Sequence, residues 1–281
     1  MADTSTAATR VALVTGASAG IGLATAEQLL ADGYTVYAAA RRVEHMAGLQ
    51  EAGARLLALD VTDDAACVAA MEQIQAEAGR LDVLINNAGY GSYGAVEDVP
   101  LAEARYQFEV NLFGLARLTQ LALPLMRSQH SGKIVNVSSM GGKIYEPLGA
   151  WYHATKFAVE GFSDSLRLEL APHGIAVIVI QPGGIKTEWG GIAVEHMLAT
   201  SGSGAYAAQA RQHARVLGGE GGTGSPPEVI ARLISRALKD RRPRTRYSAG
   251  AGAKELLLVR KWTSDRGFDW VLRTLFRQLA R

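Results

Sequence analysis

Residues 11–22 read VALVTGASAGIG, five residues of strand-forming character followed by a turn with glycines at positions 16, 20 and 22. Residues 20–31 then have helical periodicity, so the stretch predicts a strand, a glycine-rich turn and a helix. Such a turn lets the backbone approach a pyrophosphate closely, and the helix N-terminus offers free N–H groups and a partial positive charge. A plain glycine-rich turn is the alternative, but the position after the first strand favours a dinucleotide. The residues expected at the phosphates are Gly16, Ser18, Gly20, Ile21 and Gly22.

Beyond this unit, short apolar runs alternate with longer segments of helical period. Further strands are expected at 35–41, 55–61, 81–86, 133–138, 175–181 and 245–249, and helices at 43–52, 63–79, 101–127 and 153–171. Strands without polar alternation, separated by helices, indicate a parallel sheet that is buried on both faces. We therefore predict an α/β fold in which residues 1–250 form one domain with a doubly wound, Rossmann-type, seven-stranded parallel sheet. Within it, residues 186–225 are rich in Gly, Ala and Ser and are predicted to be a mobile substrate loop or lid.

Length and composition are those of an ordinary globular protein. The 281 residues accommodate one large α/β domain, and 48% of them are hydrophobic and 20% charged. Cys67 is the only cysteine, which excludes an intrachain disulfide and fits a reducing compartment. Residues 1–10 are polar, and the chain has no run of about 18 apolar residues. We expect neither a signal peptide nor a membrane span. We therefore expect a cytoplasmic protein.

The end of the second predicted strand bears on the choice of coenzyme. In NAD enzymes an Asp or Glu about 20 residues beyond the turn binds the ribose hydroxyls. Here Ala40 stands at that place and is followed by Arg41 and Arg42. A guanidinium binds phosphate through two parallel hydrogen bonds, which suits a 2′-phosphate. The two arginines could simply solvate a strand end, but they favour NADP(H) over NAD(H).

A candidate acid/base pair lies further along the chain. Tyr152 and Lys156 are four residues apart and hence on one face of a predicted helix. A free tyrosine has a pKa of about 10, and a neighbouring ammonium together with the positive charge of oxidised nicotinamide favours the phenolate. Ser139, at the end of the strand predicted at 133–138, can donate a hydrogen bond to a carbonyl oxygen that is being reduced. Alone, the Tyr-x-x-x-Lys spacing is a common coincidence, and the neighbouring motifs make it informative.

Together these motifs resemble the short-chain dehydrogenase/reductase family over about residues 10–190. The phosphate-binding turn has the Gly-x₃-Gly-x-Gly spacing of that family rather than the usual Gly-x-Gly-x-x-Gly. Ser139 precedes Tyr152 by 13 positions, as in many members, and is therefore preferred over Ser138 as the catalytic serine. The other matching elements, in family order, are Asp60, the segment 86–89 (NNAG), Asn111, Tyr152 with Lys156, and Pro182-Gly183.

The resemblance implies a role for each matched residue. Tyr152 would be the general acid in reduction and the base in oxidation, and Ser139 would polarise the substrate oxygen. Lys156 would lower the pKa of Tyr152 and hold the nicotinamide ribose, and Asn111 would support a water-linked proton relay to Lys156. Besides the turn, the arginines, Tyr152 and Lys156, the implied coenzyme contacts are Asp60, Val61, Asn87, Ala88, Gly89, Pro182, Gly183, Ile185 and Thr187.

Three positions depart from the family pattern. Ala19 stands where many NADP-preferring members carry a basic residue, so the coenzyme preference rests on Arg41 and Arg42. Lys186 adds a basic group near the expected phosphates. The tail beyond residue 250 lies outside the family core, so its role does not follow from the resemblance.

The residues around the expected substrate cleft suggest a hydrophobic ketone or alcohol. The large side chains expected to flank it are Tyr145, Trp151, Trp189 and Met197, with few charges nearby. Family members grouped with hydroxysteroid and retinol dehydrogenases have a similar extended tail. His153 points about 100° away from Tyr152 around the helix and is expected to be structural. No histidines have paired metal-ligand spacing, and no metal is expected.

The C-terminal extension, residues 251–281, is predicted to be a basic amphipathic helix. From Arg241 onward there are 11 Lys and Arg against 3 Asp and Glu, a net charge of +8, whereas the rest of the chain has 18 against 24, a net charge of −6. Such a helix is compatible with an anionic membrane surface. Packing of the apolar face on the subunit, or over the substrate cleft, is favoured over membrane binding. Nucleic-acid binding is the least favoured of the three.

The sequence thus favours an NADP(H)-dependent carbonyl reductase or alcohol dehydrogenase. A nucleotide-sugar epimerase or dehydratase shares Tyr-x-x-x-Lys, but has a different glycine spacing and a longer substrate domain. A coenzyme-sensing regulator would not need the acid/base pair. Because helices 101–127 and 153–171 commonly form a subunit interface in the family, a homodimer or homotetramer is expected.

Overall fold

The structure is a computed structural model that describes residues 9–218 and 224–279. In these two parts, seven strands form one sheet in the order β3-β2-β1-β4-β5-β6-β7, and every neighbouring pair is parallel. The strands are β1 (Val11–Thr15), β2 (Thr35–Ala40), β3 (Arg55–Ala58), β4 (Val83–Asn86), β5 (Gly132–Val137), β6 (Ile175–Pro182) and β7 (Arg246–Ala249). The predicted doubly wound sheet is confirmed, and the order reverses between β1 and β4, where ligands bind in such folds.

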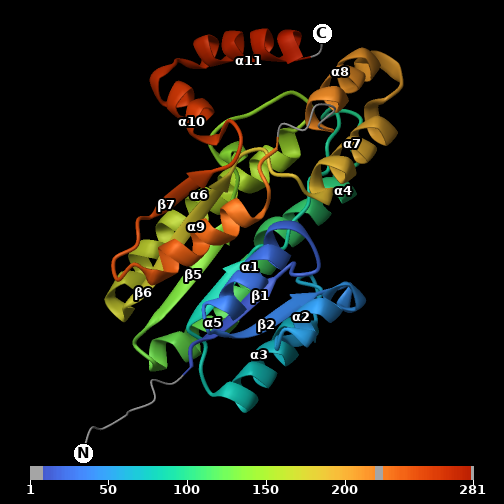
Figure 1. Cartoon of the computed structure of the whole chain (residues 1–281). Helices are drawn as coiled ribbons and strands as arrows, with labels where there is room; N and C mark the ends of the chain where they lie inside the picture. The colour runs from blue at the N-terminus through green and yellow to red at the C-terminus, as the bar shows by residue number, and fades with distance from the viewer. Residues whose placement is uncertain (1–8, 219–223, 280–281) are drawn as a thin grey trace, which may run out of the picture.

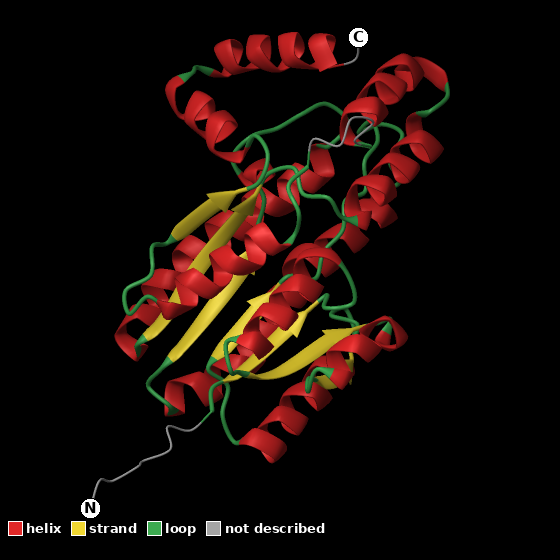
Figure 2. Ribbon diagram, viewed as in Figure 1, coloured by secondary structure: helices red, strands yellow, loops and turns green. Residues whose placement is uncertain are grey.

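Two helical layers cover the sheet (Figures 1 and 2). One face carries α1 (Gly20–Ala31), α2 (Ala47–Glu51) and α9 (Glu228–Lys239), and the other carries α3 (Asp64–Ala78), α5 (Gly114–Ser128) and α6 (Ala150–Leu170). Alternate residues of β1 enter the two cores: Val14 packs in the first layer and Leu13 in the second, both fully buried. Burial on both faces explains why these strands lack polar alternation.

The helix predicted at 101–127 is interrupted. It consists of α4 (Leu101–Phe108), a π-helical turn η2 (Glu109–Phe113) and α5. A π turn widens the helix by one residue and is frequent at functional sites. Sequence periodicity does not reveal it, because the apolar spacing continues across the turn.

The segment 186–225, predicted to be a mobile substrate loop or lid, is largely helical in the described residues rather than a loop. It contains α7 (Glu188–Ser201) and α8 (Ala207–Leu217), while positions 219–223 lie outside the described residues. We call residues 188–217 the lid. Buried Ala193, Met197 and Ala210 fix the lid against the body of the protein. Their burial outweighs the low helix propensity of Gly190 and Gly191.

The C-terminal extension is helical, as predicted. It consists of α10 (Ala253–Trp262) and α11 (Asp265–Leu279), which we call the arm. The arm follows β7 and lies beyond the same end of the sheet as the lid, with α11 drawn across the top of Figure 1. In the part of the chain that the structure describes, no helix is long and apolar enough to cross a bilayer.

Candidate active site

The turn between β1 and α1 has the geometry of a phosphate cradle. Gly16 and Gly20 have φ values of +66° and +56°, a backbone region that favours glycine. A side chain at Gly22 would collide with the carbonyl oxygen of Gly16. No described side chain caps α1, and its first turn carries no acidic residue. The first N–H groups of a 12-residue helix therefore face the turn, which fits a pyrophosphate.

Hydrogen bonds join this turn to the end of β4. The Thr15 hydroxyl donates to the Ile85 carbonyl at 3.2 Å and accepts the backbone N–H groups of Asn87 and Ala88, each at 3.0 Å. The Asn87 side-chain amide donates to the Thr15 carbonyl at 2.9 Å. The two predicted coenzyme segments, 16–22 and 87–89, are thus held together at the switch point of the sheet.

The predicted adenosine end lies at the carboxyl ends of β2 and β3. Arg41 and Arg42 are exposed directly after β2, and Arg42 forms an ion pair with Glu188 of the lid at 3.0 Å. Asp60 lies beyond β3, where its carboxylate accepts the Thr62 N–H at 2.9 Å. Val61, next to it, is buried in the core. Two exposed guanidiniums and no neighbouring carboxylate from β2 are compatible with a 2′-phosphate.

The candidate acid/base residues meet at the start of α6. Tyr152 and Lys156 are both buried, with 7% of each residue exposed. The Lys156 ammonium lies 6.0 Å from the centre of the Tyr152 ring and donates to the Val137 carbonyl at 3.0 Å. Ser139 follows β5 and its hydroxyl accepts the Gly141 N–H at 3.0 Å. The structure therefore brings the three predicted residues together.

Burial controls the ionisation of this group. Burial raises the pKa of Tyr152 above its usual range, and a hydrogen bond with Ser139 acts in the opposite direction. Burial lowers the pKa of Lys156 to about 8, although the nearby Glu160 carboxylate acts to raise it. Tyr152 is therefore protonated at neutral pH, which is the state that a proton donor needs.

Asn111 occupies the π turn η2 and is 1% exposed. Its side-chain amide donates to the Tyr90 carbonyl at 3.0 Å and to the Thr155 hydroxyl at 3.1 Å, and its oxygen accepts the Tyr90 N–H at 3.0 Å. A β-carbon at Gly89 would lie 3.0 Å from that oxygen and 3.8 Å from the Lys156 ammonium nitrogen. Asn111 thus connects the segment after β4 with α6, next to Lys156.

The segment after β6 carries the remaining predicted contacts. Pro182 ends the strand, and Gly183 donates its N–H to the Ala249 carbonyl at 2.8 Å. Ile185 packs on the first core layer. Thr187 caps α7 by accepting the Trp189 N–H at 3.4 Å. Its methyl group lies beside Gly20, so this segment borders the phosphate turn.

Aromatic side chains form the wall beside Tyr152. The Trp189 ring lies 5.0 Å from the Tyr152 ring, and the Tyr93 ring lies 5.6 Å from it. Met197 is fully buried in the same cluster, together with Leu148. The predictions for Trp189 and Met197 are therefore supported by position, and the wall beside the acid/base group is apolar.

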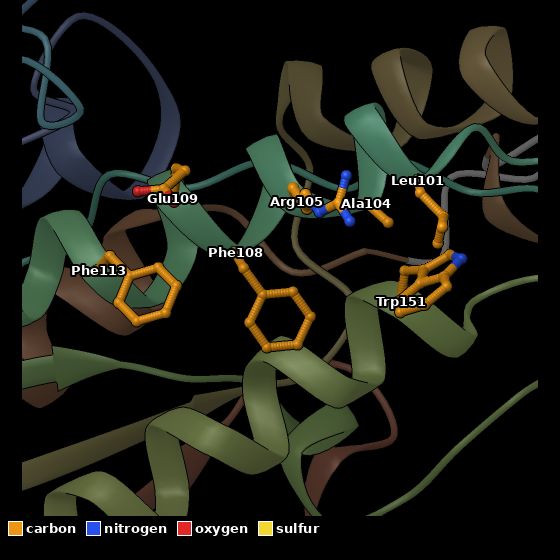
Figure 3. Close-up of a pocket in the computed structure, with 7 residues that line it drawn as sticks. All are labelled: Leu101, Ala104, Arg105, Phe108, Glu109, Phe113 and Trp151. Carbon is orange, nitrogen blue, oxygen red and sulfur yellow. The ribbon is translucent and has the colours of Figure 1, made fainter.

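Two other aromatic residues predicted to flank the cleft lie elsewhere. Tyr145 packs under the arm, and its hydroxyl donates to Asp269 at 2.9 Å. Trp151 points to the outer surface of α6, where it lines a shallow pocket of about 300 Å³ with Phe108 and Phe113 (Figure 3). One residue along a helix changes direction by about 100°, which separates Trp151 from Tyr152.

His153 is structural, as its helical direction predicted. It is buried, its Nε2 accepts the Glu146 N–H at 3.1 Å, and its Nδ1 lies 2.9 Å from the Gly141 carbonyl oxygen. Tyr93 was not predicted from the sequence, and its hydroxyl donates to Glu146 at 2.8 Å beneath the aromatic wall. Residues 93 and 146 belong to separate loops, so no local spacing indicates that they meet.

Comparisons with known proteins agree with this geometry. A sequence model of the short chain dehydrogenase family matches residues 10–196. The chain is 34% identical over 270 residues to a 3-ketodihydrosphingosine reductase of Bacteroides thetaiotaomicron, covering 95% of this chain and 98% of that protein. It is 40% identical over 191 residues to an NADPH-dependent 3-dehydrocapnine reductase of Ornithobacterium rhinotracheale, covering 64% of this chain and 68% of that protein. A crystal structure of a short-chain dehydrogenase from Streptomyces avermitilis is similar with a TM-score of 0.78 and 34% identity, covering 98% of this chain and 96% of the other.

Proposed function

The chain belongs to the short-chain dehydrogenase family, and from this premise we propose that it is an NADP(H)-dependent oxidoreductase of a hydrophobic ketone or aldehyde and the corresponding alcohol. The observation that carries the proposal is the buried group of Tyr152, Lys156 and Ser139 beside the glycine turn. NADP(H), when bound, supplies or accepts the hydride.

In this proposal the side chains handle the proton and the substrate oxygen. Tyr152 donates its proton to the oxygen during reduction and takes it back during oxidation. The Ser139 hydroxyl binds the same oxygen and stabilises the charge that develops on it. Lys156, whose pKa is lowered to about 8 by burial, is close enough to neutrality to exchange protons. Asn111 fixes the backbone of residue 90 and Thr155 around Lys156, which supports a proton relay there.

The preference for NADP(H) is supported by Arg41 and Arg42. Both are exposed at the end of β2, the strand that pairs with β1, and they follow the glycine turn by about 20 residues, where dinucleotide-binding folds carry the group that binds the ribose. A relative that is 40% identical is named as NADPH-dependent. Lys186 is also exposed beside the turn and adds positive charge for the phosphates.

A ketone substrate is supported by the walls of the site and by the relatives. Trp189, Tyr93 and Met197 surround Tyr152 with apolar surface. The names of both relatives specify reduction at a 3-keto or 3-dehydro position. We therefore favour reduction of a ketone that carries a long apolar group.

A subunit interface on α4, α5 and α6 is part of the proposal. These helices and the π turn η2 expose large apolar side chains on the outer surface, namely Leu101, Tyr106, Phe113, Phe157 and Leu168. An apolar surface of this kind is typical of a homo-oligomer interface. We expect at least a homodimer, and analytical ultracentrifugation of the purified chain measures it.

The test of the proposed function is a panel of ketones of increasing chain length, followed at the NADPH absorbance band. Oxidation of NADPH that requires a ketone, with lower KM for longer apolar chains, is the expected result. The same panel with NADH should give much lower kcat/KM. A protein that binds NADPH but oxidises it with none of the ketones, and reduces NADP with none of the alcohols, would contradict the proposal.

A further inference from the structure

The arm has two faces, and the inner one is fixed to the protein. Phe268 is fully buried and Leu272 is 6% exposed, and both pack with Ile144 and Tyr145 of the loop after β5. The Phe276 ring stacks on His213 of the lid, with ring centres 4.5 Å apart. The apolar side of α11 is therefore already occupied within the subunit, as the sequence analysis favoured.

The outer face of α11 carries cations and one indole. Arg266, Trp270, Arg273 and Arg277 follow one another at intervals of four, three and four residues, and all four are exposed. At about 100° per residue they lie within about 60° of one another around the helix. Arg273 and Arg277 also line the cleft between α11, the lid and the loop after β5. Among the described residues of α11, the two carboxylates are engaged elsewhere. Asp265 pairs with Arg260 at 2.7 Å, and Asp269 binds Tyr145.

A second exposed stripe lies on α10. Leu258 is 59% exposed and Trp262 is 78% exposed, four residues apart on one side of the helix. Lys254 is a further four residues back and is exposed. The Lys261 ammonium lies 5.7 Å from the centre of the Trp262 ring. Both helices of the arm thus combine exposed indole rings with cations.

We propose that this outer face of the arm binds the surface of a membrane that contains anionic lipids. Indole side chains favour the boundary between headgroups and acyl chains, and lysine and arginine beside them bind lipid phosphates. Residues 251–281 contain seven Lys and Arg against three Asp and Glu, a net charge of +4, whereas the rest of the chain has 22 against 24, a net charge of −2. An anionic surface therefore attracts the arm more strongly than the rest of the molecule.

Other occupants fit these features less well. Nucleic acid would use the cations, but would leave Leu258 and Trp262 in water. A second copy joined by a two-fold axis would bring the arginine stripe of one arm next to the same stripe of the other, and like charges repel. A bilayer surface takes up the indole rings at the headgroup boundary and binds the arginines through its phosphates. It therefore neither leaves apolar side chains in water nor brings like charges together.

The arm lies on the side of the sheet where the substrate has to enter. Its inner face contacts the lid and the loop after β5, and both border the candidate active site. Docking through the outer face would therefore hold the site near a lipid surface from which an apolar substrate could enter. The docking itself does not depend on the proposed reaction.

The test is cosedimentation of the full chain, without coenzyme or substrate, with vesicles of phosphatidylcholine alone or with 30% phosphatidylglycerol. Binding to the anionic vesicles at least tenfold tighter than to neutral ones, a blue shift of tryptophan emission and loss of binding in 0.5 M salt are expected. Trp262→Ala/Trp270→Ala and Arg266→Glu/Arg273→Glu should each weaken binding at least fivefold. A coenzyme-binding titration checks that the variants are folded.

The matched control is Arg241→Glu/Arg242→Glu. It changes the net charge by the same amount, at exposed residues that precede β7 and hence lie at the opposite end of the sheet. Equal loss of binding in this control would overturn the proposal, because net charge alone would then explain it. The proposal would also be overturned if the chain bound duplex DNA but not anionic vesicles, or if Trp262→Ala/Trp270→Ala abolished self-association instead of vesicle binding.

Discussion

Residues 9–182 and residues 183–279 contribute to the same site in different ways. The first region contains β1 to β6, with the glycine turn, Asn111, Ser139, Tyr152 and Lys156 at the carboxyl side of the sheet. The second contains the lid and the arm, which supply Trp189 and the cover over the loop after β5. Most site groups of the first region belong to motifs that are short in sequence, whereas Tyr93 and the groups of the second region are positioned by contacts between distant segments. In the proposed function the acid/base group belongs to the first region, whereas Trp189 and Met197 of the second region complete the apolar wall beside it, and the following experiments test that separation.

Tyr152→Phe should have the largest effect. Removal of the hydroxyl deletes the proposed proton donor, so kcat/KM should fall by about 10³-fold, within the range typical of a general acid. The NADPH dissociation constant should change by less than about threefold, because the ring and its packing remain. Steady-state kinetics and coenzyme fluorescence titration measure the two quantities. Turnover within tenfold of the wild type would contradict the role of Tyr152.

Arg41→Ala/Arg42→Ala should have the next largest effect. Loss of two charge-assisted contacts should raise the NADPH dissociation constant by about 10- to 100-fold and leave that of NADH nearly unchanged. Isothermal titration with each coenzyme checks this. Lys239→Ala, which removes an exposed cation at the C-terminus of α9, is the control. Equal losses for both coenzymes would show that the two arginines do not bind a 2′-phosphate.

Trp189→Ala tests the second region. The change removes a large part of the apolar wall beside Tyr152, so the KM for long-chain ketones should rise about tenfold. The NADPH dissociation constant should stay within about twofold, since the phosphate turn and the arginines belong to the first region. Kinetics with a short and a long ketone separate the two effects. A large loss of coenzyme affinity would break the proposed division between the regions.

Lys156→Met tests how far the buried lysine of the first region lowers the free energy of unfolding. Burial lowers the pKa of Lys156 from its ordinary value of 10.5 to about 8. While the amine is charged in both the folded and the unfolded chain, that difference corresponds to roughly 3 kcal/mol of lost stability. Methionine has no charge to bury, so the substitution should stabilise the fold. Loss of the hydrogen bond to Val137 offsets about 1 kcal/mol of this gain, which leaves a net stabilisation of about 2 kcal/mol at pH 7.

The pH dependence of this gain follows from proton binding. Between pH 8 and 10.5 the unfolded chain keeps the Lys156 proton that the folded chain has lost, so the stability of the wild type rises with pH in that window. The advantage of Lys156→Met should therefore be largest at pH 7 and shrink toward pH 10. Thermal unfolding at several pH values measures it, and an advantage that grows with pH would contradict the lowered pKa.

The same two regions differ in how far sequence predicted them. The glycine turn at 16–22, most strand ends and the pairing of Tyr152 with Lys156 depend on residues close in sequence, and the structure places them as expected. The third strand is the exception, since it was predicted to reach residue 61 and ends at Ala58. Residues 186–225 were predicted to be a mobile loop or lid because they are rich in Gly, Ala and Ser, whereas Met197 and Ala193 stabilise a helix by packing against Tyr93. Tyr93 itself was missed for the same reason. Contacts of this kind depend on the tertiary fold, which a single sequence does not reveal.

The Arg42–Glu188 ion pair joins the two regions, because Arg42 follows β2 and Glu188 begins the lid. Any anion that draws Arg42 away leaves Glu188 without this partner and loosens the first turn of α7, where Trp189 is the next residue. Linkage is reciprocal, so a lid displaced by substrate would in turn release Arg42 toward a phosphate. An exposed pair contributes at most about 1 kcal/mol, which limits this cooperativity to about fivefold. The pair therefore couples the binding of the two ligands weakly and equally in both directions, and it does not set the order in which they bind.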